Sequence, residues 1–64
     1  MIDATPAPLI SERLAELIDR YAAKPDAKGN WFTYEAFKGQ AYLTAESAAE
    51  YEEAVRAYAR KVGL

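Results

Sequence analysis

The chain contains neither cysteine nor histidine, and this limits how a sequence of 64 residues can fold. A domain of this size buries only about 60% of the surface that its unfolded chain exposes, so it usually needs a staple, a metal, a partner or very regular helix packing. Disulfides are excluded without cysteine, and a conventional zinc site is excluded because such sites use cysteine and histidine. Regular helix packing or self-association therefore has to stabilise the fold.

Aromatic residues have to supply much of the core. The apolar fraction is 52%, but many of these residues are alanines, which bury little area each. The chain has five tyrosines, two phenylalanines and one tryptophan, and each aromatic side chain buries about 150–250 Å². The tryptophan, both phenylalanines and two of the tyrosines lie in residues 31–43. The conformation of this segment therefore decides the fold.

A first long helix is predicted over residues 9–23. Its apolar residues recur with the period of an amphipathic helix, and they are Ile10, Leu14, Leu17, Ile18 and Tyr21. Pro25 ends this helix, because the residue before a proline disfavours the helical conformation. Residues 1–8 contain two prolines and no apolar period, so we expect a flexible arm there and one helical domain over residues 9–64.

A second long helix is predicted over residues 45–62. Thr44 is a suitable N-cap, and Gly63 stands where a C-terminal glycine is expected. Acidic residues come first in this segment and basic residues last, as the helix dipole favours. The expected inward stripe consists of Ala48, Tyr51, Val55, Tyr58 and Val62.

Two interpretations compete for residues 31–43. As a short helix over residues 34–42, the segment has Thr33 as its N-cap and a hydrophobic staple between Phe32 and Phe37. As a β-hairpin, it makes the fold α-ββ-α, but neither strand face is cleanly polar. We favour the helix, and hence an all-α domain of three helices in which Phe32, Phe37 and Leu43 belong to the core. Trp31 either covers that core or stands exposed.

The residue types argue against catalysis, so we expect a protein that is not an enzyme. Without histidine and cysteine, the usual general base and the strongest nucleophile are missing. Ser11 and Ser47 stand near helix starts, where capping explains them. The glycines are too far apart for a phosphate-binding loop, and we expect no cofactor and no metal. A signal peptide and a membrane span are not recognisable, so we expect a cytoplasmic protein without membrane contact.

A nucleic acid is an unfavourable partner for this composition. The net charge is −2, whereas nucleic-acid binders usually carry a basic patch. A helix-turn-helix-like regulator is an alternative, because a short helix followed by a longer one resembles that arrangement. In that motif the start of the second helix enters the major groove, and here this start is acidic.

A protein–protein interaction module, such as an inhibitor, adaptor or regulator, is the function that these exclusions favour. We expect it to dock on a larger protein through a surface made of Trp31, Glu46, Glu50 and Glu53. The three acids lie within about 60° of arc on the predicted helix, away from its apolar stripe, and tryptophan is a frequent anchor of interfaces. A structural homo-oligomer, and in particular a homodimer that completes the thin core, is the other alternative.

Overall fold

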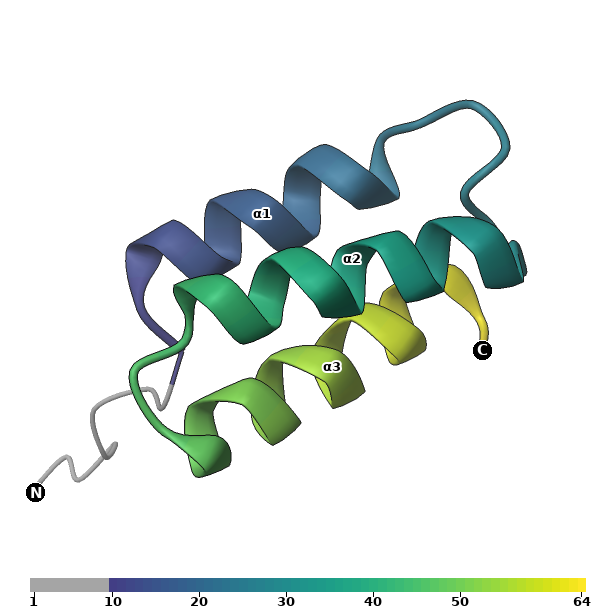
Figure 1. The fold of residues 1–64 in the computed structure, drawn as a ribbon. Helices are drawn as coiled ribbons and strands as arrows, with labels where there is room; N and C mark the ends of the chain where they lie inside the picture. Colours follow the sequence, from purple (N-terminus) through teal and green to yellow (C-terminus); the bar gives the residue numbers. More distant parts are fainter. Residues whose placement is uncertain (1–9) are drawn as a thin grey trace, which may run out of the picture.

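The computed structural model describes residues 10–64 and consists of three helices (Figure 1). These are α1 (Glu12–Ala22), α2 (Trp31–Thr44) and α3 (Ala48–Val62). Each helix packs against the other two, and the described part of the chain contains no strand. The all-α, three-helix prediction is therefore confirmed, and the hairpin alternative is wrong. The expected arm over residues 1–8 lies outside the described residues.

Helix α1 begins where a serine can cap it. The Ser11 side chain accepts a hydrogen bond from the Leu14 N–H at 3.3 Å, and the Ser11 backbone is extended. The helix therefore starts at Glu12, later than the predicted residue 9. Leu14, Leu17 and Ile18 are buried, which confirms the predicted apolar stripe.

Helix α2 starts earlier than predicted because Asn30, and not Thr33, is its N-cap. The Asn30 side chain accepts a hydrogen bond from the Thr33 N–H at 3.0 Å. Gly29 turns the chain into this cap with a φ of 65°, in the left-handed region that favours glycine. Its N–H donates to the Val62 carbonyl at 2.8 Å, which fastens the α1–α2 loop to the end of α3.

The end of α2 also differs from the prediction, because the residue predicted to cap α3 is still part of α2. Thr44 is not the N-cap of α3 but the last residue of α2, and its hydroxyl donates to the Gln40 carbonyl at 2.8 Å. Ser47 caps α3 instead, accepting a hydrogen bond from the Glu50 N–H at 3.1 Å. Gly63 ends α3 with a φ of 76°, as the sequence predicts.

A stack of two aromatic rings lies at the centre of the core. Phe37 of α2 and Tyr58 of α3 are fully buried, with ring centroids 4.3 Å apart and an angle of 12° between the rings. Tyr21 of α1 meets the Phe37 ring edge-on, at a centroid distance of 5.9 Å. Ala41 and Ala54 are also fully buried, so α2 and α3 each carry a small residue in the core. All three helices thus meet at one aromatic cluster.

Two of the predicted core residues are on the surface. Phe32 is 87% exposed and Leu43 is 77% exposed, whereas Phe37 is buried as predicted. With Asn30 as the cap, Phe32 falls on the side of α2 away from Phe37, so the predicted staple between them does not form. Tyr58 and Val62 of the predicted α3 stripe are buried, Tyr51 and Val55 are half-buried, and Ala48 is exposed.

The Tyr58 hydroxyl is a polar group inside this core. It finds no hydrogen-bond partner among residues 10–64. Burial raises the pKa of Tyr58, because the charged form is disfavoured away from water, and Tyr21 raises it further.

The two phenylalanines provide a test of this arrangement. Phe37→Ala should destabilise the fold by on the order of 3–5 kcal/mol, because it removes the centre of the core. Phe32→Ala should change the free energy of unfolding by no more than about 0.5 kcal/mol, because Phe32 is on the surface. Urea denaturation followed by circular dichroism at low protein concentration measures both. Equal losses for the two variants would contradict the packing.

Candidate protein-interaction surface

Helix α2 is apolar on two opposite sides. One side holds Phe37 and Ala41, which are buried against α1 and α3. The other side carries Phe32 and Leu43, both strongly exposed. With 3.6 residues per turn, the outward residues form one row, which we call the outer row: Phe32, Ala36, Gly39 and Leu43. The outer row is thus an exposed, uncharged surface without a partner in residues 10–64.

A second row runs beside the outer row, on the side toward α3. We call it the flank row, and its members are Trp31, Glu35, Lys38 and Tyr42. Trp31 is 62% exposed and Tyr42 is 72% exposed. The Trp31 ring leans on Tyr34 at a centroid distance of 5.0 Å, and Tyr42 meets Tyr51 of α3 edge-on at 5.8 Å. These contacts hold both exposed rings in place. The two rows together make the α2 surface.

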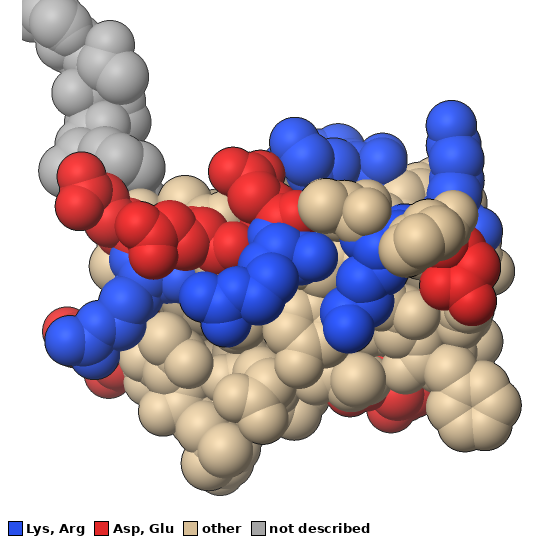
Figure 2. All heavy atoms as spheres, turned by 90° about the horizontal axis from the view of Figure 1, so that it is seen from above, with Lys and Arg blue, Asp and Glu red and all other residues tan. Residues whose placement is uncertain are grey.

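The α2 surface carries little net charge. Its two charged side chains pair with each other, with Lys38 Nζ 3.2 Å from Glu35 Oε2. Elsewhere charged side chains are abundant, and Figure 2, seen from the α1 side, shows them gathered over the upper part of the view. The lower edge of that view, which corresponds to the front of Figure 1 where α2 lies, is mostly uncharged.

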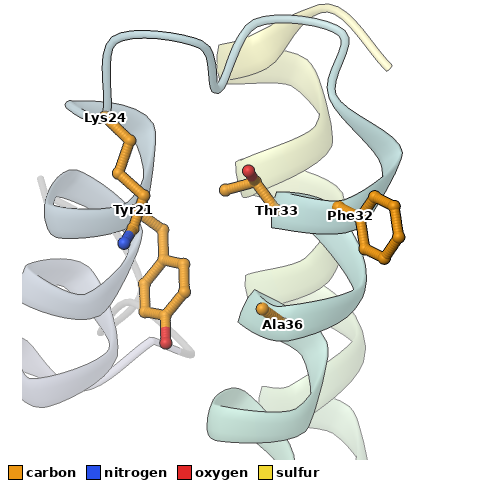
Figure 3. Close-up of a pocket in the computed structure, with 5 residues that line it drawn as sticks. All are labelled: Tyr21, Lys24, Phe32, Thr33 and Ala36. Atoms are coloured by element: carbon orange, nitrogen blue, oxygen red, sulfur yellow. The ribbon is translucent and has the colours of Figure 1, made fainter.

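A shallow groove borders the outer row near the start of α2. Its lining residues come from the last turn of α1, the loop that follows it and the first turns of α2, and they are Tyr21, Lys24, Phe32, Thr33 and Ala36. Its volume is about 290 Å³. In Figure 3, Tyr21 and Thr33 lie on facing sides of the groove, while the Phe32 ring projects from the far side of α2. The groove therefore lies on the α1 side of α2, and the Phe32 ring points away from it.

Gly39 lies in the middle of the outer row. A glycine inside a helix is destabilising by about 1 kcal/mol relative to alanine. Nothing within the described fold requires it, because its φ is not positive and a Cβ there would meet no described atom within 4 Å. The absent side chain leaves the backbone of α2 open to a close approach from outside.

The four residues predicted from the sequence as a contact surface are not brought together. The starts of α2 and α3 lie at opposite ends of the bundle (Figure 1), so Trp31 is far from the three acids. Glu46 is exposed, whereas Glu53 is half-buried and lies 3.3 Å from Arg56 and 3.9 Å from Arg60. Glu50 is only 7% exposed. The expectation that all three acids face outward is therefore wrong for Glu50.

Glu50 connects two helix starts from inside the fold. Its Oε2 accepts a hydrogen bond from the Ser11 N–H and its Oε1 accepts one from the Glu46 N–H, both at 2.8 Å. These two backbone donors, with Glu46 first, hold the pKa of Glu50 below its usual value. A serine cap followed three residues later by glutamate is the sequence signature of a capping box. Ser47 and Glu50 have this spacing, but the Glu50 carboxylate accepts from the N–H of Glu46, one residue before the cap, instead of from the Ser47 N–H.

The outer row is difficult to recognise from the sequence alone. Residues 32, 36, 39 and 43 follow the helical spacing of 4, 3 and 4, which becomes visible only once α2 is known to run past both expected ends.

Other kinds of site find little support in the described residues. Residues 10–64 contain no cluster of three His, Cys, Asp or Glu side chains arranged to hold a metal ion. No helix in this part of the chain is long and apolar enough to cross a membrane. Comparison of the chain with protein-family models, curated proteins and solved structures gave no significant match. Function therefore has to be argued from the residues themselves.

The depressed pKa of Glu50 predicts a specific dependence of stability on pH. A carboxylate with a lowered pKa in the folded state contributes its full stabilisation above the unfolded value of about 4.3, and loses it as the pH falls through the folded value. Glu50→Gln should therefore lower the melting temperature at pH 7, and the difference from wild type should shrink toward pH 3. Glu53→Gln is the control, because Glu53 forms ion pairs only with the exposed side chains of Arg56 and Arg60. A difference that does not vary with pH would contradict the assignment.

Gly39, in the middle of α2, is a position where a substitution should stabilise the fold. Gly39→Ala should stabilise the fold by about 1 kcal/mol, because it gains helix propensity and meets no neighbour. Gly63→Ala should instead destabilise it, because position 63 has a positive φ that an L side chain rarely adopts. Urea denaturation at low protein concentration measures both. A loss of stability in Gly39→Ala would show that position 39 is not open.

Proposed function

We propose that the protein is a non-enzymatic protein–protein interaction module whose contact surface is the α2 surface. The observation that carries this proposal is the concentration of exposed apolar side chains on one helix. Single exposed hydrophobic residues are normal on protein surfaces, but Trp31, Phe32, Tyr42 and Leu43 are all more than half exposed on α2 alone. Contiguous apolar patches of this kind mark interaction sites.

The composition of the α2 surface supports a protein as the partner. Interfaces are enriched in aromatic residues, and tryptophan and tyrosine are frequent anchors of binding energy. The Trp31 and Tyr42 rings already lean on neighbouring rings, so less side-chain freedom is lost on binding. Trp31 is thus retained from the surface predicted by sequence, whereas the acids Glu46, Glu50 and Glu53 are replaced by the apolar residues of α2.

A nucleic acid fits the α2 surface less well. Proteins that stack bases on aromatic rings combine those rings with a positively charged groove. Here the net charge of the chain is −2, and the lysine of the flank row is paired with Glu35. The absence of histidine and cysteine from the chain supports the further part of the proposal, that the module works without catalysis.

The test compares two sets of surface variants. Phe32→Ser combined with Leu43→Ser removes the apolar ends of the outer row, and Leu64→Ser is the matched control, because Leu64 is an exposed apolar residue outside the α2 surface. Proteins of the native host retained by immobilised wild type are identified by mass spectrometry, purified and titrated by calorimetry. The double variant should weaken binding at least tenfold, about 1.4 kcal/mol, and the control should not. A purified partner that binds the double variant as tightly as wild type would overturn the proposal.

A further inference from the structure

The α2 surface has a pattern that reads similarly in both directions along the helix. The outer row runs from a large apolar residue through two small ones to a second large one: Phe32, Ala36, Gly39 and Leu43. The flank row runs from an aromatic residue through an acid and a base to a second aromatic residue: Trp31, Glu35, Lys38 and Tyr42. Both rows have the spacing 4, 3 and 4. A surface of this kind is complementary to its own reversed copy.

We propose that the partner of the α2 surface is a second copy of this chain, with the two α2 helices antiparallel about a twofold axis between Ala36 and Gly39. This inference rests on the proposed function and names its partner. In a twofold interface the same patch meets itself, so that each contact occurs twice.

The outer row supports this pairing through the sizes of its residues. Reversing one helix places Phe32 of each copy opposite Leu43 of the other. The same reversal places Ala36 opposite Gly39, so that only small residues meet at the axis. Two helices can then approach closely, because Gly39 has no side chain and a Cβ there would meet nothing in the described part of its own chain. The pairing thus accounts for a glycine that the monomer does not need.

The flank row supports the pairing through its charges. The twofold axis leaves the flank row of one copy beside the flank row of the other, running in the opposite direction. Glu35 of each copy then lies beside Lys38 of the other, and Trp31 beside Tyr42. Glu35 and Lys38 already pair within one helix at 3.2 Å. In the dimer the same four charges form an alternating cluster, with opposite charges adjacent across the interface.

The available area predicts a weak dimer. Fully burying an aromatic side chain removes about 150–250 Å² from water, so the three exposed rings offer on the order of 400 Å² per copy. Leu43 and the backbone around Gly39 bring this toward the roughly 600 Å² per partner found in the smallest specific interfaces. We therefore expect a dimer that forms with a dissociation constant on the order of 10 μM, rather than a permanent one.

Analytical ultracentrifugation of the full chain tests the association. From about 1 μM to about 1 mM, wild type should change from monomer to dimer. Gly39→Met, which adds bulk at the axis, and Leu43→Ser should each weaken the dimer at least tenfold, and Leu64→Ser should not. Circular dichroism confirms that each variant is folded. A wild type that stays monomeric up to about 1 mM, or a dimer that neither variant weakens, would overturn the inference.

A charge exchange distinguishes a second copy from a different partner. Glu35→Lys or Lys38→Glu alone should weaken self-association about threefold to tenfold at low salt, because like charges then meet across the interface. The double variant that exchanges both charges should restore it, because each copy changes in the same way. A different partner protein would not carry the exchanged charges, so the double variant would not restore its binding. A double variant as weak as the single ones would therefore contradict self-pairing.

Engineered cysteines test the antiparallel direction, since the natural chain has none. A mixture of Phe32→Cys and Leu43→Cys chains should form mainly the disulfide between the two different variants, because a disulfide requires Cβ atoms about 4 Å apart. Equal yields of all three pairings would contradict the antiparallel arrangement. If wild type is monomeric but another protein binds through the α2 surface, the proposed function stands and the inference of a second copy fails.

Discussion

The stack of Phe37 on Tyr58 is the contact on which the rest of the structure depends. It joins α2 to α3, and the edge of Tyr21 joins α1 to the same ring. The chain has few large aliphatic residues and no staple, so a compact aromatic centre has to hold three short helices together. Fixing Phe37 inward also fixes the residues half a turn away outward. The exposed outer row is therefore a direct consequence of how the core is built.

The Glu50 carboxylate is a second contact on which the fold depends, at the end of the bundle where α1 and α3 begin. Two backbone N–H groups, from Ser11 and Glu46, would otherwise lack these partners near the starts of α1 and α3. Hydrogen bonds to a charged acceptor are stronger than neutral ones, so the acid stabilises the starts of two helices with one side chain. Its use inside the fold explains why an acidic contact surface that includes Glu50 does not form. For this reason the contact surface that we propose uses the apolar residues of α2 and not the acids predicted from the sequence.

The sequence predicts α1 and α3 well because each has one apolar side and one polar side. It predicts α2 less well because this helix is apolar on both sides, and its pattern has no clear helical period. The sequence leaves the N-caps of α2 and α3 ambiguous, because Asn30 and Thr33 are both good capping residues, as are Thr44 and Ser47. With Asn30 as the cap, Phe32 is part of the helix and lies about 140° around its axis from Phe37, so it is on the surface and not in the core. Phe37 is predicted correctly because it is inward under either choice.

The unpartnered hydroxyl of Tyr58 sets a limit on the conditions that the fold tolerates. Burial raises the pKa of this group, so folding opposes the formation of tyrosinate at the centre of the ring stack. The stability associated with the neutral hydroxyl is complete below the unfolded tyrosine pKa of about 10, and it is lost as the pH rises through the higher folded value. Glu50 limits the fold at the acid end, since its pKa is lowered. One aromatic core residue and one buried acid thus weaken the fold at opposite ends of the pH scale, Glu50 as the pH falls and Tyr58 as it rises.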